Sequence, residues 1–534
     1  MTTMINGSQL IAGTESREGY RSFSGSNPRT KQPLPQLFFE ATHQEIDQAL
    51  KAARVAFEET RGYPASWLAN FLEQVAREIE NLGDQLLQTA DEETGLGINR
   101  LAGERARTTG QLRKFAALLQ EGSYVEAIID TAQPDRKPTP QPSIRRMLFP
   151  LGPIAVFSAS NFPLAFAVAG GDTASAFAAG CPVIVKGHPS HPSTSELFGR
   201  AVNRAVTEMS FPPGFFSLLQ GSSIEVGRTL VTHPDLAAVG FTGSLRAGRS
   251  IFDAVAARPK PIPVYAEMGS LNPVVILPGA LAERSQAILE GFIHSLTLGS
   301  GQFCTNPGLV FLINGQETVA FADDLTTRMA DLQPGVLLNA NVERGLADAV
   351  DQTLVHPAVE RLTGGDVIDG RAYCYANTVL RTTAAAFRSD PNLQVEHFGP
   401  VTLLVICEDE ADLLAALSAL HGNLTATVHV GEEEGELAGR LLATLREKAG
   451  RLIWDGFPTG VEVVYAMQHG GPYPATTAPW TTSVGLMAIK RFMRPVAFQD
   501  VPDSLLPPAL QNANPLGIWR IIDDHWTQDP AVEA

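Results

Sequence analysis

The sequence predicts an α/β protein built on a doubly wound parallel sheet. Short runs of branched apolar residues alternate with helical patterns of roughly ten to fifteen residues, which is the signature of strand–helix–strand units. These runs show no polar alternation, as expected for strands covered on both faces. The apolar stretch 151–185 is broken by prolines, glycines and Asp172, so we interpret it as part of this sheet and not as a membrane span.

Four strand–helix pairs are expected in succession, followed by a second alternating region. In the first region, we expect strands at 154–157, 183–186, 216–219 and 237–241, and helices at 164–179, 195–209, 224–231 and 247–257. In the second, we expect strands at 274–277 and 309–313, helices at 282–298 and 318–331, and a helix-rich stretch at 411–449.

The flanking segments complete the predicted domain organisation. Residues 43–120 show helical periodicity, and a Pro-rich run at 134–142 leads into an edge strand of a protruding hairpin. We therefore predict three parts: a dinucleotide-binding domain, a catalytic domain, and a β hairpin with the tail that joins subunits. Their expected ranges are 1–133 with 151–269, then 270–493, and 134–150 with 494–534.

Composition excludes several classes of protein. The 534 residues include 40 basic and 57 acidic side chains, a net charge of −17, which disfavours nucleic acid and anionic membranes as partners. The four cysteines show no CxxC spacing, so we expect neither a disulfide framework nor a zinc knuckle. The first 30 residues contain no apolar core of a secretory signal, and we expect a cytoplasmic protein.

Cys304 is the strongest candidate nucleophile. It follows a predicted helix that ends in glycines, in the run GSGQFCTNPG (299–308). A reactive thiol needs partial exposure and nearby donors, and glycines let the backbone approach a ligand. Taken alone, a cysteine is more often a small core residue, which is our interpretation of Cys181, Cys374 and Cys407.

Glu267 is the candidate general base, 37 residues before Cys304. It stands in AEMGSLNP (266–273), after a strand-like run and between apolar residues and a glycine. Burial there would raise its pKa toward that of a useful base. A helix-capping or ion-paired glutamate is the alternative interpretation.

Two further motifs follow predicted strands. Asn161, in FSASNFP (157–163), places an amide donor where ligands bind in doubly wound sheets, although an ordinary helix N-cap would also suit asparagine. GFTGSLRAG (240–248) joins a strand to a helix through glycines, an arrangement that binds phosphate. The run 243–250 is close to a Walker A loop, but arginine stands where the lysine is required, which disfavours an NTPase.

Together these motifs resemble the aldehyde dehydrogenase superfamily. The resemblance extends to VKGHPSHP (185–192) and EHFGP (396–400) and covers nearly the whole chain. The runs 185–196, 469–477 (HGGPYPATT) and 491–507 are similar to one branch of it. That branch holds 2,5-dioxovalerate (α-ketoglutaric semialdehyde) dehydrogenases and related NADP-linked aldehyde dehydrogenases.

The resemblance implies a catalytic role for three residues. Cys304 would attack the aldehyde carbon, the Asn161 amide and the Cys304 backbone N–H would hold the oxyanion, and Glu267 would activate the water that releases the acid from a thioester. It also implies a set of cofactor-binding residues: Lys186 on the adenosine ribose, Ser160, Gly243, Ser244, Gly248, Glu396 on the nicotinamide ribose, and Phe398 beside its ring.

The cofactor is expected to be NADP, or else NAD. Relatives that prefer NAD often carry a glutamate three residues after the lysine, and here that position is Pro189. A 2′-phosphate would meet no repulsion there and would be attracted by Lys186, with Arg228 a further candidate contact. His188 and His191 form an HxxH pair with no evident third ligand, so we predict no metal site.

The expected substrate is 2,5-dioxopentanoate. Its carboxylate needs a cation, and the family lines its substrate tunnel with the helix that carries Arg100 and Arg107 here, although solvated arginines paired with Glu104 are equally compatible. Phe162, Phe166 and Phe303 would form an apolar lining, which also suits the alternative, a medium- or long-chain fatty aldehyde.

Two other predictions concern the assembly of the protein and its broad class. By family analogy, the hairpin around 141–149 and the tail near 494–503 join subunits into a homodimer or homotetramer. A non-catalytic nucleotide-binding scaffold is the alternative from a different class, and the presence of Cys304, Glu267 and Asn161 together argues against it. An esterase side activity through the same thiol stays open.

Overall fold

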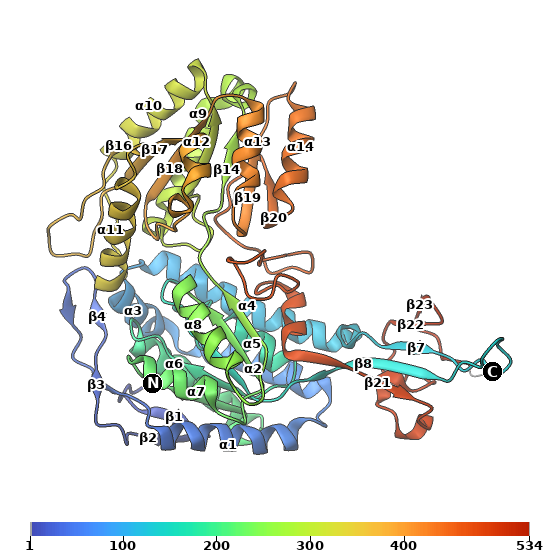
Figure 1. Cartoon of the computed structure of the whole chain (residues 1–534). Helices are drawn as coiled ribbons and strands as arrows, with labels where there is room; N and C mark the ends of the chain where they lie inside the picture. Colours follow the sequence, from blue (N-terminus) through green and yellow to red (C-terminus); the bar gives the residue numbers. More distant parts are fainter. Residues whose placement is uncertain (1–2, 533–534) are drawn as a thin grey trace.

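The computed structural model describes residues 3–532 and confirms the predicted doubly wound sheet, which lies in the lower part of Figure 1. Its strand order is β13-β12-β9-β10-β11-β1-β2, and the strands from β13 to β11 are parallel. Their bounds are β1 Gln9–Ile11, β2 Thr14–Ser16, β9 Ile154–Phe157, β10 Val183–Lys186, β11 Phe216–Leu219, β12 Ala238–Thr242 and β13 Val264–Glu267. The chain order reverses between β9 and β12, which places the expected ligand crevice at the carboxyl ends of these two strands.

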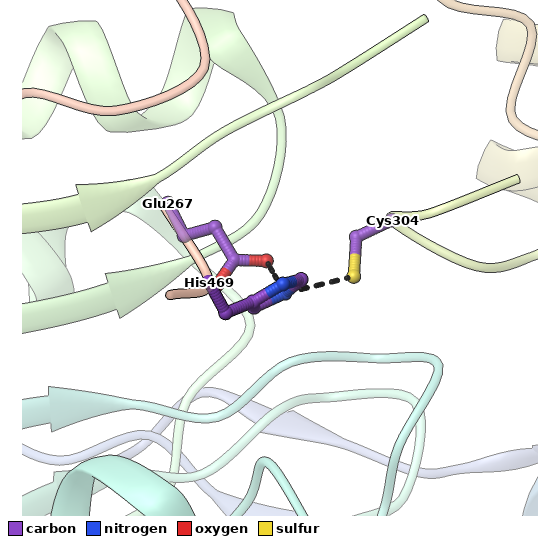
Figure 2. Close-up of side chains that lie close together, drawn as sticks. All are labelled: Glu267, Cys304 and His469. Carbon is purple, nitrogen blue, oxygen red and sulfur yellow. Dashed lines mark hydrogen bonds and ion pairs between the residues drawn. The ribbon is translucent and has the colours of Figure 1, made fainter. Parts of the chain in front are cut away.

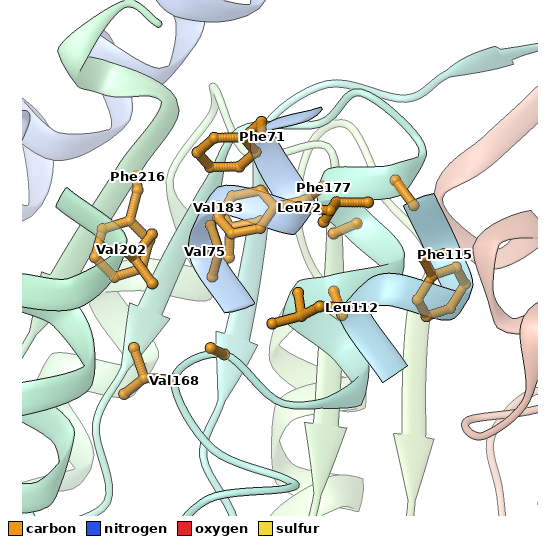
Figure 3. Packing of buried hydrophobic residues seen from close by; sticks show 14 of the residues in the cluster. Phe71, Leu72, Val75, Leu112, Phe115, Val168, Phe177, Val183, Val202 and Phe216 are labelled. Atoms are coloured by element: carbon orange, nitrogen blue, oxygen red, sulfur yellow. The ribbon is translucent and has the colours of Figure 1, made fainter. Parts of the chain in front are cut away.

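Helices cover both faces of this sheet. One face packs against α2 (Ala65–Asn81), α3 (Gly83–Thr94), α4 (Ile98–Glu121), α5 (Gly171–Ala178) and α6 (Pro192–Glu208). The other packs against α1 (His43–Thr60), α7 (Ile224–Thr232) and α8 (Leu245–Ala256). Figure 3 shows the first core, to which Phe71 of α2, Phe115 of α4 and Phe177 of α5 all contribute; the ring centres of Phe71 and Phe177 are 5.1 Å apart.

The predicted helix 164–179 is wrong in its first part, because α5 begins only at Gly171. The backbone N–H groups of Leu164 and Ala165 donate to Glu104 Oε1 of α4 at 2.8 and 2.9 Å. A Cβ at Gly170 would lie 2.5 Å from the carbonyl oxygen of Ala165. The chain therefore makes a tight turn here, and that turn holds the segment after Asn161 against α4.

The second sheet has the order β16-β17-β18-β15-β14-β19-β20, with only β16 antiparallel. Its strands are β14 Val274–Ile276, β15 Leu309–Ile313, β16 Glu360–Thr363, β17 Thr378–Thr383, β18 Val401–Cys407, β19 Asn423–His429 and β20 Ala449–Trp454. One face packs on α9 (Pro278–Thr297) and α10 (Gln316–Asp331). The other packs on α11 (Ala340–Leu354), α12 (Ala384–Ser389), α13 (Glu410–Ser418) and α14 (Gly435–Leu445).

The helix-rich stretch predicted at 411–449 is wrong in its middle, because β19 lies between α13 and α14. All seven residues of β19 are buried. A strand covered on both faces shows no polar alternation, so its sequence does not separate it from a buried helix segment.

A third sheet projects from the side of the molecule (Figure 1), in the order β21-β8-β7-β22-β23. Its strands are β7 Ile128–Asp130, β8 Ile144–Pro150, β21 Met493–Gln499, β22 Arg520–Ile522 and β23 His525–Thr527. The prediction of β8 as an edge strand is wrong, because β21 from the tail pairs along its outer side. Two small pairs complete the strands: β3 Ser22–Phe23 with β6 Phe38–Phe39, and β4 Ser26–Asn27 with β5 Gln32–Pro33. Within residues 3–532, no helix is both long and apolar enough to cross a bilayer.

A buried ion pair links the C-terminal part of the chain to a helix that packs on the first sheet. Arg491, in the 3₁₀ segment η5 (Leu486–Phe492), lies 2.7 Å from Asp172 of α5, and both side chains are buried. We expect Arg491→Ala to lower the free energy of unfolding by about 3–5 kcal/mol, because it leaves a buried carboxylate unpaired. Arg440→Ala breaks the exposed pair with Glu410 and should cost at most about 1 kcal/mol. Urea unfolding of both variants checks this, and equal losses would contradict it.

Candidate active site

Three side chains from distant parts of the chain meet at one point (Figure 2). Glu267 ends β13, Cys304 follows the 3₁₀ turn η3 (Leu298–Gly301) after α9, and His469 lies in the connection between β20 and η5. Cys304 Sγ is 3.6 Å from His469 Nε2, and the same nitrogen is 3.1 Å from Glu267 Oε1. A nucleophile, an imidazole and a carboxylate are therefore in contact in a row.

The backbone before Cys304 is fixed by residues with left-handed dihedral angles. Ser300 has φ +58° and Gly301 has φ +67°. A Cβ at Gly301 would lie 2.2 Å from the carbonyl oxygen of Gly399, so the close approach requires glycine. On the other side, Asn272 Nδ2 donates to the carbonyl oxygen of Cys304 at 2.8 Å. These contacts determine where the thiol points.

The resting protonation state follows from burial and charge. Burial raises the pKa of the Cys304 thiol well above its ordinary value, and the neighbouring charge of Glu267 raises it further. Burial also pushes the pKa of Glu267 upward, but His469 and a hydrogen bond from Ser483 Oγ outweigh it and leave that pKa below its ordinary value. The expectation of a raised Glu267 pKa is therefore wrong in direction. Near neutral pH the proton lies on the sulfur and the negative charge on the carboxylate.

His469 is the residue that reasoning from the sequence missed. Its side chain is fully buried, its backbone N–H donates to Thr482 Oγ1 at 2.8 Å, and its carbonyl accepts the N–H of Ser483 at 2.8 Å. Because Nε2 touches both neighbours, it can accept the thiol proton and then donate to the carboxylate. Its only sequence signal is its place at the head of the HGGPYPATT run.

Asn161 comes from the turn after β9 and reaches the loop that carries Cys304. Its side chain is buried, and Nδ2 donates to the carbonyl oxygen of Gln302 at 3.0 Å. Arg100 Nη2 donates to the Asn161 carbonyl at 2.7 Å, which fixes the backbone of this turn. An amide nitrogen carries two hydrogens, so one donor stays available for a ligand.

Comparison with known proteins agrees with this geometry. The sequence profile of the aldehyde dehydrogenase family matches residues 14–466. The chain belongs to the aldehyde dehydrogenase family. It is 47% identical to "Alpha-ketoglutaric semialdehyde dehydrogenase 2" of Azospirillum brasilense, over 97% of this chain and 98% of that one. It is 41% identical to "Alpha-ketoglutaric semialdehyde dehydrogenase" of Acinetobacter baylyi, over 98% and 99%. These findings confirm the resemblance stated from the sequence motifs.

Solved structures confirm the fold. Betaine aldehyde dehydrogenase of Staphylococcus aureus, crystallised with NAD+, superposes with a TM-score of 0.79 at 20% identity, covering 93% of this chain and 95% of that one. PnpE of a Pseudomonas species gives a TM-score of 0.78 at 20% identity, covering 94% and 99%. At this level of identity the likeness is one of architecture.

The residues predicted to bind the nucleotide phosphates lie at the carboxyl end of the first sheet of this aldehyde dehydrogenase. Ser160 follows β9, while Gly243 and Ser244 are exposed between β12 and α8. Ser244 Oγ caps the N–H of Ala247, and the exposed first turn of α8 offers further backbone donors that fit a pyrophosphate. Gly248 is buried, and a Cβ there would lie 2.6 Å from Met268 Sδ, so its small size allows α8 to pack on the sheet.

The residues predicted on the nicotinamide side come from the loop before β18. Glu396 Oε1 accepts the N–H of Ser270 in a long bond of 3.4 Å, its one hydrogen bond among residues 3–532. Burial raises the pKa of Glu396 to about 7. A carboxylate with so few hydrogen-bond donors around it has free acceptor sites, which the hydroxyl groups of a ribose could occupy as donors. Phe398, two residues on, is partly exposed.

The predicted substrate residues form a continuous stack beside the thiol. The Phe303 ring lies 5.1 Å from Phe162, and Phe162 lies 5.2 Å from Phe166. The guanidinium carbon of Arg100 lies 4.9 Å from the ring centre of Phe303 and 5.1 Å from that of Phe162. The guanidinium carbon of Arg107 lies 5.2 Å from the ring centre of Phe166. The structure thus brings the two cations and three rings together next to Cys304.

The two histidines of the HxxH pair contact each other and the backbone. The His188 and His191 rings stack at 5.5 Å, and His191 Nε2 contacts the carbonyl oxygen of Ala159 at 2.9 Å. Of the other cysteines, Cys181 and Cys407 are buried and Cys374 is half-buried.

Proposed function

We propose that this aldehyde dehydrogenase oxidises 2,5-dioxopentanoate to 2-oxoglutarate with NADP, or else NAD. The observation that carries the proposal is the contact series Cys304–His469–Glu267 beside a stack that holds Arg100 and Arg107. The two curated relatives named for this activity, aligned over nearly their whole length, support the substrate.

The reaction begins at the thiol. His469 Nε2 takes the proton of Cys304, and Glu267 stabilises the resulting imidazolium through the 3.1 Å contact. The thiolate adds to the aldehyde carbon, and the free amide hydrogen of Asn161 and the backbone N–H of Cys304 stabilise the oxyanion. Glu396 and the first turn of α8 would hold the nicotinamide cofactor, which would supply the hydride acceptor that this carbon requires.

Release of the acid then depends on Glu267. After hydride loss the sulfur carries a thioester, and Glu267, whose other oxygen is held by Ser483, takes a proton from the attacking water. Water adds to the acyl carbon, and the carbon–sulfur bond breaks. The leaving thiolate recovers its proton through His469.

The two arginines of the aromatic stack favour an acidic substrate. Arg100 is mostly buried, and its Nη1 has no hydrogen-bond partner in the described structure. Among residues 3–532, the Arg107 side chain makes two hydrogen bonds, both long at 3.3 Å, to Gln111 Oε1 and to the Val461 carbonyl oxygen. Burial lowers the pKa of both arginines, the expected effect of desolvation on a cation, and a substrate carboxylate would offset that cost.

The cofactor preference rests on the adenosine side. Lys186 Nζ donates to the Gly221 carbonyl at 2.5 Å, and burial lowers its pKa to about 8 against the opposing effect of Glu40. A 2′-phosphate would strengthen the cation, and Pro189 offers it no repulsion. We therefore propose NADP as the preferred cofactor and NAD as the second.

The projecting sheet is the proposed contact between subunits. β21 and β23 lie at its two edges, and Ile144 and Trp526 are exposed on it. Pairing with another copy would cover these edges. A homodimer or homotetramer formed through this sheet is the proposed assembly.

Replacing Arg107 tests the substrate assignment without disturbing Asn161, which Arg100 supports. We expect Arg107→Met to lower kcat/KM for 2,5-dioxopentanoate by about 10- to 100-fold, because one charge-assisted hydrogen bond to the substrate is lost. The kcat/KM for pentanal, which has no carboxylate, should change little. Arg105→Met, on the same helix and bonded to the Gly83 carbonyl, is the matched control.

The same steady-state panel compares 2,5-dioxopentanoate, pentanal and decanal on the wild type with both nicotinamide cofactors. Preference for the dioxo acid with NADP supports the proposal. A large preference for decanal would replace it with the fatty aldehyde alternative. Equal losses in Arg107→Met for pentanal and the dioxo acid would remove Arg107 from the substrate site.

A further inference from the structure

The Cys304–His469–Glu267 cluster combines three kinds of metal ligand. Sγ, Nε2 and a carboxylate oxygen lie within 4.8 Å of one another. In a tetrahedral zinc site with bonds of about 2.0–2.3 Å, adjacent ligand atoms are about 3.3–3.6 Å apart. The observed separations of 3.6 Å from Sγ to Nε2 and 3.1 Å from Nε2 to Oε1 are close to those edges.

The ligand atoms are held in place by their surroundings. Ser483 Oγ donates to Glu267 Oε2, which leaves Oε1 directed at the histidine. His469 is fully buried and fixed at its backbone by Thr482 and Ser483, so its ring is already positioned. Two of the three separations between ligand atoms are therefore close to those of a zinc site before a cation binds.

We propose that Cys304, His469 and Glu267 bind Zn²⁺, with water as the fourth ligand, and that the bound metal reversibly inhibits the enzyme. The S–H bond breaks, its proton passes to solvent, a sulfur–zinc bond forms, and no redox change occurs. The same three atoms serve catalysis in the proposed function, so metal and aldehyde exclude each other. The inhibition rests on that function, whereas the binding does not.

The donor set determines which cations fit. Thiolate and imidazole favour zinc and cobalt, whereas magnesium and calcium prefer oxygen ligands. The spacing of these residues in the sequence resembles no zinc motif, because the ligands meet only through the fold. Mg²⁺ therefore provides a negative control at equal concentration.

Titration of the full-length protein with Co²⁺ tests binding without substrate. We expect a thiolate-to-cobalt absorption band that saturates at one equivalent per chain and is displaced by Zn²⁺. Cys304→Ser should abolish the band, and Cys374→Ser, which alters another partly exposed thiol, should retain it. His469→Phe should weaken binding at least about 10-fold. Far-UV circular dichroism checks that each variant is folded, and His469→Gln replaces the phenylalanine variant if that one fails.

Inhibition is then measured with Zn²⁺ on the wild-type enzyme. We expect inhibition that follows metal occupancy, competes with the aldehyde and is reversed by EDTA. A cobalt band that survives Cys304→Ser, or unchanged affinity in both histidine variants, would overturn the site. Zinc that occupies the site while turnover continues would overturn the inhibition. Failure of the dioxopentanoate assignment would leave the cobalt titration unchanged, so the two proposals are separable.

Discussion

Cys304→Ser will lower kcat/KM for aldehyde oxidation by at least about 10³-fold, because it removes the nucleophile on which every step of the proposed reaction depends. The hydroxyl keeps the size of the side chain, and the contacts of Gly301 and Asn272 that direct residue 304 stay in place. What is lost is the nucleophile: a serine hydroxyl is far less acidic than a thiol, and His469 has less to gain from accepting its proton.

Steady-state NADPH formation measures this loss, and cofactor binding to the variant, followed by fluorescence, shows that the site is otherwise intact. Cys374→Ser is the matched control and should retain wild-type activity, because that thiol lies outside the cluster and contacts the Gly335 carbonyl. Undiminished oxidation by Cys304→Ser would overturn the nucleophile assignment and, with it, the proposed reaction.

Much of the fold could be predicted because the relevant signals are local. The strands β10, β11 and β15 are short, mainly apolar runs bounded by turns, and their predicted limits agree with the structure. Cys304 and Glu267 could be selected because each lies within three residues of a glycine, among apolar neighbours where a polar side chain lacks an ordinary structural role. Sequence patterns therefore predict the residues whose position depends on their neighbours in the chain.

The rest depends on contacts across long stretches of chain. His469 lies 165 positions from Cys304 in a segment without periodicity, so no pattern places it beside the thiol. The backbone N–H groups of Leu164 and Ala165 donate to Glu104 instead of to a helix, so α5 begins later than predicted. The local sequence does not indicate this contact with a distant side chain. The sign of the Glu267 pKa shift likewise depends on His469 and Ser483, because burial alone would raise it.

Glu267→Gln will lower the steady-state rate by about 10²- to 10⁴-fold and will convert the time course into a burst. In the variant His469 Nε2 still accepts the thiol proton, so the aldehyde is captured and one equivalent of NADPH forms per active site. The thioester then accumulates, since an amide cannot take a proton from water. Rapid-mixing absorbance measures the burst amplitude against the concentration of active sites.

The control is Glu225→Gln, which alters an exposed glutamate in α7 and should show wild-type turnover without a burst. The amplitude also separates two roles that the geometry allows for one carboxylate. A burst near one equivalent assigns Glu267 chiefly to the hydrolysis of the thioester. A slow rate with no burst would contradict this expectation and place its main effect earlier, in stabilising the imidazolium that forms when Cys304 loses its proton, because the 3.1 Å contact to Nε2 serves that step.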